Sequence, residues 1–187
     1  MSVFIRSLTV SVIAGLFAIA VMSPVTANSA TMAEIDRDAD AALQQLFNST
    51  PAAKVLAQEA KAILVFPNIL KAGFIVGAQS GNGALRKKGR TVGYYNTTSA
   101  SYGLQAGIQK YGYALFFMSE SALLYLDKSD GWEIGVGPSI VVVDTGLART
   151  LTTTTVKKEI YAFIFHQKGL MAGLGLQGTK ITRIYPD

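Results

Sequence analysis

The stretch from residue 73 to residue 118, GFIVGAQSGNGALRKKGRTVGYYNTTSASYGLQAGIQKYGYALFFM, decides the fold. Short runs of β-branched, aromatic and small residues alternate in it with glycine, a pattern typical of strands separated by turns. The dipeptides Asn82-Gly83 and Lys88-Gly89 predict hairpin turns. The runs between them predict strands at Gly73–Ser80, Gly83–Lys87, Thr91–Tyr95, Ser101–Gln109 and Tyr113–Met118.

The flanking sequence adds helices before this stretch and more strands after it. Residues 32–62 predict two helices, because an apolar stripe at helical spacing is followed by Thr50-Pro51, a typical helix start. The stripe consists of Ile35, Ala39, Ala42, Leu43 and Leu46. A third helix is predicted at Ser119–Lys128. Further strands are predicted at Trp132–Val136, Ser139–Asp144, Glu159–His166, Leu170–Gln177 and Lys180–Tyr185.

Three apolar runs without polar alternation, at 114–118, 140–143 and 161–165, indicate strands that are covered on both faces. We therefore expect an α+β fold: a curved antiparallel β-sheet, or two packed sheets of barrel-like shape, with the N-terminal helices packed against it. Glycines recur four residues apart, as at Gly73 and Gly77, which predicts tight bends or close backbone approach. Membrane-helix packing is a poorer explanation of this spacing, because no long apolar helix follows residue 27.

The first 27 residues have the pattern of a secretory signal peptide. Arg6 precedes an apolar run from Leu8 to Met22, and Val25-Thr26-Ala27 provides the small residues of a cleavage site. As a helix the run spans about 22 Å, short of the roughly 30 Å of a bilayer core. We expect residues 1–27 to be removed and residues 28–187 to form one exported domain, periplasmic in a Gram-negative cell or secreted.

The composition excludes several classes of protein. Of 187 residues, 50% are hydrophobic and 16% charged, which excludes a disordered chain. There is no cysteine and one histidine, so disulfides, cysteine chemistry, lipoprotein attachment and a cysteine–histidine zinc site are not expected. His166 has no nucleophile pattern near it in sequence. We therefore expect no enzyme activity, no catalytic residue, no metal and no cofactor.

Two further motifs have plain explanations. Residues 36–40, DRDAD, begin like a calcium loop, but Ala41 and Phe47 replace its required glycine and glutamate, so a solvated helix face is predicted. The glycine-rich segment Gly77–Gly83 lacks the Gly-Lys-Ser/Thr ending of a phosphate-binding loop, so a hairpin turn is predicted.

The charge pattern favours an anionic partner. The chain has a net charge of +5, and four cations crowd into residues 86–90 at a predicted hairpin turn. Such a cluster suits phosphate headgroups, although an ordinary soluble loop is the plainer explanation. Lys157-Lys158 is a second basic pair. Nucleic acid is not expected, because the aromatic residues lie within apolar runs instead of between basic ones.

Four segments, in order, resemble the SYLF domain family, also described as yeast-type actin-regulator or Las-binding domains. They are residues 62–74 (AILVFPNILKAGF), 101–107 (SYGLQAG), 131–139 (GWEIGVGPS) and 169–173 (GLMAG). The resemblance extends over roughly residues 32–185. It implies lipid binding without catalysis, and for an exported bacterial member the available anionic lipids are phosphatidic acid, phosphatidylglycerol or cardiolipin. Actin, a partner of some eukaryotic members, is not expected for an exported chain.

The sequence thus predicts a domain that binds anionic phospholipid, or a membrane surface, through basic residues and a neighbouring apolar groove. The expected headgroup contacts are Lys61, Lys71, Arg86, Lys87, Lys88 and Arg90. The alternative is a structural or protein-interaction module of the bacterial envelope, without lipid specificity.

Overall fold

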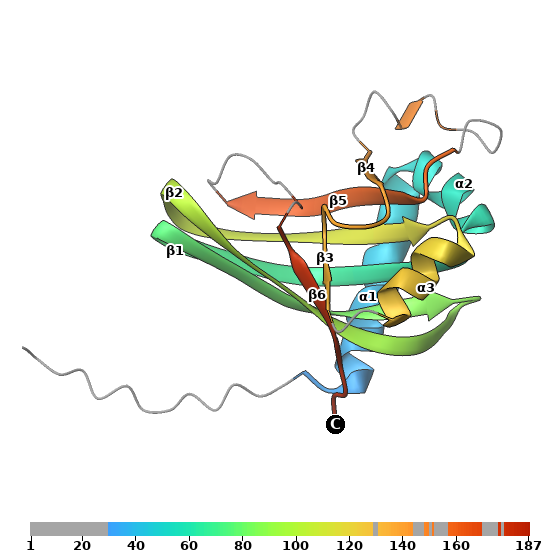
Figure 1. The fold of residues 1–187 in the computed structure, drawn as a ribbon, viewed down its shortest axis with the longest axis horizontal. Coiled ribbons are helices and arrows are strands. Elements are labelled where there is room, and N and C mark those ends of the chain that lie inside the picture. The colour runs from blue at the N-terminus through green and yellow to red at the C-terminus, as the bar shows by residue number, and fades with distance from the viewer. Residues whose placement is uncertain are drawn as a thin grey trace, which may run out of the picture.

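The computed structural model describes residues 30–128, 131–143, 148–149, 151, 157–169, 176 and 178–187, and at 74–75, 101–106 and 167–169 it describes the backbone alone. The predicted signal peptide and nearly all of the predicted strand Leu170–Gln177 lie outside these residues. In chain order the elements are α1 (Met32–Ser49), α2 (Pro51–Glu59), β1 (Ala62–Lys87), β2 (Arg90–Phe117), α3 (Glu120–Lys128), β3 (Trp132–Glu133), β4 (Ile140–Val142), β5 (Ile160–Gly169) and β6 (Lys180–Ile184) (Figure 1).

The helices form where the sequence predicts them. A capping box begins α1: Thr31 Oγ1 accepts a hydrogen bond from the Glu34 N–H, and the Glu34 carboxylate accepts one from the Thr31 N–H at 3.0 Å. The second of these bonds lowers the pKa of Glu34. Pro51 begins α2, and the predicted apolar stripe of α1 is buried throughout. The prediction of α3 is also confirmed.

One long hairpin forms the centre of the sheet. Strands β1 and β2, of 26 and 28 residues, pair antiparallel from Ala62 and Phe117 at one end to Lys87 and Arg90 at the other. Lys88 and Gly89 form the turn with φ of 50° and 76°, as the sequence predicts. The predicted turn at Asn82-Gly83 is wrong, because both residues pair with β2 inside the hairpin. Gly77–Gly83 likewise belongs to β1.

The first strand begins earlier than predicted. It starts at Ala62, whereas the sequence places the first strand after Pro67. Pro67 lies between Phe66 and Ile69, where the register with β2 shifts. A bulge tolerates proline, because a residue there need not donate to the ladder.

The hairpin folds back on itself near Gly73. The pairing is irregular between Phe74 and Val76, and a Cβ added to Gly73 would lie 2.4 Å from the Cα of Gly77. Further along, a Cβ at Gly83 would lie 2.3 Å from the Val65 carbonyl oxygen. The predicted close backbone approach at Gly73 and Gly77 is therefore confirmed. Figure 1 shows both strands turning back at the end where β1 and β2 are labelled.

The remaining strands extend both arms of the folded hairpin. The sheet order is β3-β6-β2-β5-β4, with β1 paired to β2 on its other side. Strand β6 pairs with the first part of β2, and β5 with its last part. The predicted α+β class with a curved sheet and packed N-terminal helices is confirmed. The β4–β5 pair is parallel, which departs from the expected antiparallel sheet.

Two hydrophobic cores result. One lies between the arms of the hairpin, where Phe66, Tyr113 and Trp132 meet residues of α3. The other joins α1 and α2 to the opposite face, around Phe116 and Phe163. The predicted runs at 114–118 and 161–165 are thus buried on both faces except at Met118 and Ile164, which are half-buried. The run at 140–143 is not, because β4 ends the sheet order and Val142 is 47% exposed.

Candidate functional site

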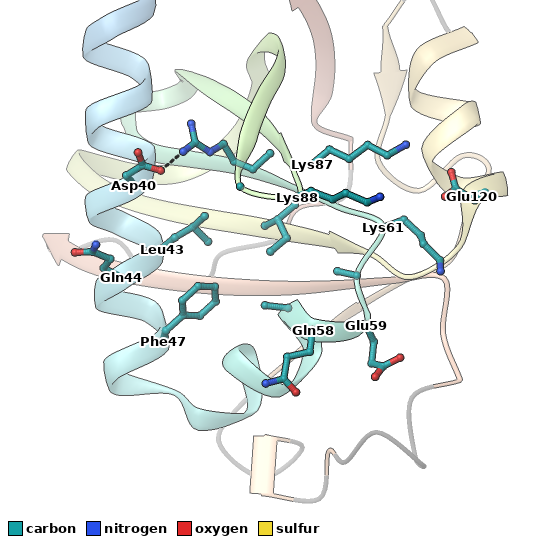
Figure 2. A pocket seen from close by; sticks show the side chains of 15 residues that line it. Asp40, Leu43, Gln44, Phe47, Gln58, Glu59, Lys61, Lys87, Lys88 and Glu120 are labelled. Atoms are coloured by element: carbon teal, nitrogen blue, oxygen red, sulfur yellow. Dashed lines mark hydrogen bonds and ion pairs between the residues drawn. The ribbon is translucent and has the colours of Figure 1, made fainter.

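A groove of about 840 Å³ lies where α1 and α2 meet the start of β1 and the turn between β1 and β2 (Figure 2). Four secondary-structure elements, α1, α2, β1 and α3, and the turn between β1 and β2 contribute to its wall. We call this cavity the basic groove. It is lined by Asp40, Leu43, Gln44, Phe47, Ala57, Gln58, Glu59, Ala60, Lys61, Ile63, Arg86, Lys87, Lys88, Gly89 and Glu120.

Three lysines of the basic groove carry charges without an ion-pair partner among the described residues. Lys61 directly precedes β1, and its N–H donates to the Phe117 carbonyl at 2.8 Å, which fixes the start of the hairpin. Lys87 ends β1, and Lys88 occupies the turn. Figure 2 shows these lysines on the side of the groove nearer α3, with their side chains extending toward α3 and away from Leu43 and Phe47 on α1. The cationic and the apolar side chains therefore line opposite sides of the groove.

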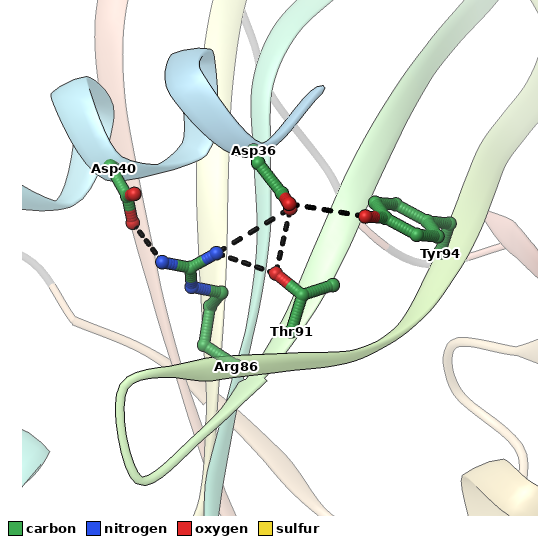
Figure 3. A network of polar contacts seen from close by, with 5 residues as sticks. All are labelled: Asp36, Asp40, Arg86, Thr91 and Tyr94. Atoms are coloured by element: carbon green, nitrogen blue, oxygen red, sulfur yellow. Dashed lines mark hydrogen bonds and ion pairs between the residues drawn. The ribbon is translucent and has the colours of Figure 1, made fainter. Parts of the chain in front are cut away.

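Arg86 is held by a polar network instead of projecting freely (Figure 3). Its guanidinium forms ion pairs with Asp36 and Asp40 of α1 and a hydrogen bond with Thr91. Thr91 donates to Asp36 at 2.7 Å, and the Tyr94 hydroxyl donates to the same carboxylate at 3.1 Å. The arginine side chain is only 13% exposed, and its charge is largely neutralised by the two carboxylates of α1. The network also raises the pKa of Tyr94, first through burial and then through the hydrogen bond to Asp36.

This network corrects two sequence-based expectations. The acids of the DRDAD segment do not form a purely solvated face, because Asp36 and Asp40 bind Arg86 across the domain. The four cations of residues 86–90 are also not equivalent. Arg86 is neutralised by α1, whereas Lys88 and Arg90 are exposed and Lys87 is half-buried.

The structure does not bring all six predicted contacts together. Lys61, Arg86, Lys87 and Lys88 line the basic groove, and Arg90 begins β2 opposite Lys87 without lining it. Lys71 lies elsewhere: it is 7% exposed and faces the hairpin interior, with Gln109 as its partner across the strands. The Gln109 side-chain oxygen is buried and has no hydrogen-bond partner among the described residues. Lys71 therefore does not contribute to the surface of the groove.

The groove also contains acids that the sequence did not single out. Glu59 ends α2 and Glu120 begins α3, so each reaches the site through packing of a helix against the hairpin. The two glutamates face three unpaired lysines. The groove is therefore weakly positive as a whole, with its free cations gathered on one side.

The structure also describes the backbone and surroundings of the single histidine. His166 takes the left-handed conformation, φ 56°, and its ring lies edge-on to Phe165 with 5.0 Å between centroids. Within the described part of the chain, no three histidine or acidic side chains gather as a metal site would require. No helix in that same part is long and apolar enough to cross a membrane.

The comparison with protein families agrees with the sequence blocks. Residues 98–184 match the Ysc84 family model, described as Las17-binding protein actin regulator. Three of the four blocks fall inside the match, and the first, at 62–74, precedes it. The resemblance is confirmed for this part of the chain: residues 98–184 match the SYLF (Ysc84) family. A search among curated proteins finds no match. The family is one of binding and regulatory domains, which is consistent with a binding module.

Proposed function

We propose that this domain binds anionic phospholipid through the basic groove. One observation carries the proposal: Lys61, Lys87 and Lys88, which have no ion-pair partner among the described residues, line one cavity together with the apolar residues Leu43 and Phe47. A phospholipid has the matching two parts, a phosphate that lysines attract and an apolar portion that leaves water when covered.

In this proposal the two sides of the basic groove contact different parts of the phospholipid. The lysines and the adjacent Arg90 take the headgroup phosphate, at about 1 kcal/mol for each cation near an anionic surface. Leu43, Phe47 and Ile63 contact the glycerol and first acyl carbons. Arg86 serves as a positioning residue, because its ion pairs tie the turn to α1 and set the width of the groove.

The wider charge distribution supports the same partner. From Ala60 to Ser119 the chain has seven cations and no aspartate or glutamate. The hairpin therefore presents no acid of its own to an anionic surface, and the acids that line the basic groove come from the helices. An anionic membrane would attract the hairpin turn more strongly than it attracts the N-terminal helix.

Co-sedimentation of residues 28–187 with phosphatidylglycerol vesicles tests the proposal. The double variant Lys87→Gln/Lys88→Gln should weaken binding about thirtyfold, or about fivefold for each lysine, and raised salt should act in the same direction. The matched control is Lys54→Gln/Lys110→Gln, which removes two exposed lysines outside the groove. Equal losses in both variants, or none in either, would reject the groove as the binding site.

We also propose that the domain works outside the cytoplasm, in the periplasm or the medium. The support is the signal-like pattern of residues 1–27. Cell fractionation, with the mass of the recovered protein, tests this. Recovery of the uncleaved chain in the cytoplasm would contradict it.

A second candidate function, a protein-interaction module, rests on the opposite end of the hairpin. Leu70, Val76 and Ile108 are 48%, 59% and 66% exposed near the fold-back. A separate cavity of about 760 Å³ there is lined by Leu70, Ala72 and small residues of both strands. A stoichiometric protein partner that is lost in Val76→Ser/Ile108→Ser, with vesicle binding unchanged, would favour this function.

A further inference from the structure

A second, smaller cavity adjoins the basic groove and shares two residues with it. Its volume is about 330 Å³, and it is lined by Glu59, Lys61, Met118, Ser119, Lys157, Lys158 and Glu159. Lys61 and Glu59 line both cavities. Lys61 thus stands between two lysine pairs, Lys87-Lys88 on one side and Lys157-Lys158 on the other.

The second lysine pair is held in place by the protein. The N–H groups of Lys157 and Lys158 both donate to the hydroxyl of Tyr161, at 3.2 and 3.3 Å. Tyr161 is 3% exposed, so it anchors this segment to the start of β5. Both lysine side chains remain exposed, without an ion pair among the described residues.

Glu159, the acid next to Lys157 and Lys158, already accepts hydrogen bonds from other parts of the protein. The Glu159 carboxylate accepts a hydrogen bond from the Ser139 N–H at 3.2 Å, and its carbonyl accepts one from the Met118 N–H at 2.8 Å. Across the two cavities, the lining therefore contains five lysines against Glu59, Glu120 and this engaged glutamate, besides the ion pair of Arg86 with Asp40. One phosphate group can contact only part of such a surface.

Building on the proposed function, we propose that the two cavities form one site with two phosphate subsites. Lys87 and Lys88 take one phosphate, Lys157 and Lys158 take the other, and Lys61 lies between them. The ligand class is an anion with two phosphates joined by a short linker. Its lipid form is cardiolipin, in which a glycerol joins the two phosphates. A lipid with one phosphate fills a single subsite.

Vesicles of matched charge test this inference. One set contains cardiolipin, and the other contains twice the mole fraction of phosphatidylglycerol, so both surfaces carry the same charge. The parent protein should bind the cardiolipin vesicles more tightly, by about thirtyfold if both lysines of the second pair contribute. Lys157→Gln/Lys158→Gln should lose this preference and still bind phosphatidylglycerol. That retained binding also shows that the variant is folded, since the anchoring bonds to Tyr161 come from the main chain.

A second experiment, competition by soluble phosphate compounds, distinguishes recognition of the two phosphates from recognition of the whole lipid. Glycerol-1,3-bisphosphate should displace the protein from cardiolipin vesicles at lower concentration than glycerol-1-phosphate does. If both compounds compete equally, or if the parent shows no cardiolipin preference while still binding phosphatidylglycerol, the second subsite is rejected and the groove stands. If the protein binds neither kind of vesicle, the proposed function fails as well.

Discussion

Arg86 of β1 is ion-paired to Asp36 of α1, with 3.4 Å between the guanidinium Nη1 and the carboxylate Oδ1, although fifty residues separate them in the chain. The same guanidinium pairs with Asp40 one helical turn later. Two carboxylates at i and i+4 lie on one face of a helix. The planar guanidinium can therefore bind both, and it joins the first helix to the hairpin turn beside the basic groove.

This pairing predicts that Arg86 contributes more to the stability of the fold than to binding of the lipid headgroup. Arg86→Gln should lower the free energy of unfolding by about 2 kcal/mol, because two carboxylates and Thr91 lose their shared partner. Arg86→Lys should recover part of the loss, since an ammonium keeps the charge and lacks the planar fork. Urea denaturation measures both. Lys88→Gln is the control and should leave the unfolding midpoint unchanged, because Lys88 is exposed and unpaired among the described residues.

Lipid binding through the basic groove predicts that the turn end of the hairpin, and not its fold-back end, contacts the membrane. The chain has no cysteine, so a single introduced cysteine can carry an environment-sensitive dye at one chosen position. With anionic vesicles, a dye on Lys88→Cys should shift its emission toward that of an apolar environment, whereas a dye on Val76→Cys should not. A shift at position 76 alone would place the fold-back end in the membrane and contradict binding through the groove.

The close approach within the folded hairpin predicts a strong steric effect at Gly83. A Cβ there would lie 2.3 Å from the Val65 carbonyl oxygen and 2.6 Å from the Phe66 ring. Gly83→Ala should cost about 1–3 kcal/mol of unfolding free energy, because the obstructing atom belongs to the backbone. Gly93→Ala is the matched control in β2: its Cβ would meet the side chains of Tyr95, at 3.2 Å, and Arg183, at 3.5 Å, and no backbone atom within 3.5 Å, so it should cost less. Equal costs in thermal or urea unfolding would contradict the proposed close packing of the two arms.

Short sequence patterns predicted the helices and the hairpin turn. The features that the sequence did not predict depend on tertiary packing. The α1 stripe and the Lys88-Gly89 turn depend on neighbouring residues, so the sequence predicts both. Asn82-Gly83 looks like a turn, but its pairing with β2 keeps it extended. The role of Arg86 depends on how α1 crosses the sheet, which no short pattern contains. Lys71 shares a strand face with buried Ile69, so its burial follows only once β1 is known to begin before Pro67.

Buried tyrosines in the hairpin predict a loss of stability at high pH. Burial raises the pKa of Tyr95 and of Tyr111 to about 12, and burial raises the pKa of Tyr113 further still. The Asp127 charge adds to the effect at Tyr95, whereas the hydrogen bond to Gln79 opposes it at Tyr111. In the unfolded chain these phenols ionise near 10. A raised pKa in the folded state stabilises the fold fully below pH 10, and this contribution is lost as pH rises from 10 to about 12.

Urea unfolding at a series of alkaline pH values, together with tyrosinate absorbance, checks this prediction. The parent should lose stability steadily above pH 10, and buried tyrosines should ionise together with unfolding. Tyr111→Phe removes one titrating group, so its stability should fall less steeply over the same range. At neutral pH this variant should be less stable than the parent, because Gln79 loses the hydrogen bond from the Tyr111 hydroxyl at 2.7 Å. Parallel pH profiles for parent and variant would show that Tyr111 ionises as readily in the folded protein as in the unfolded chain.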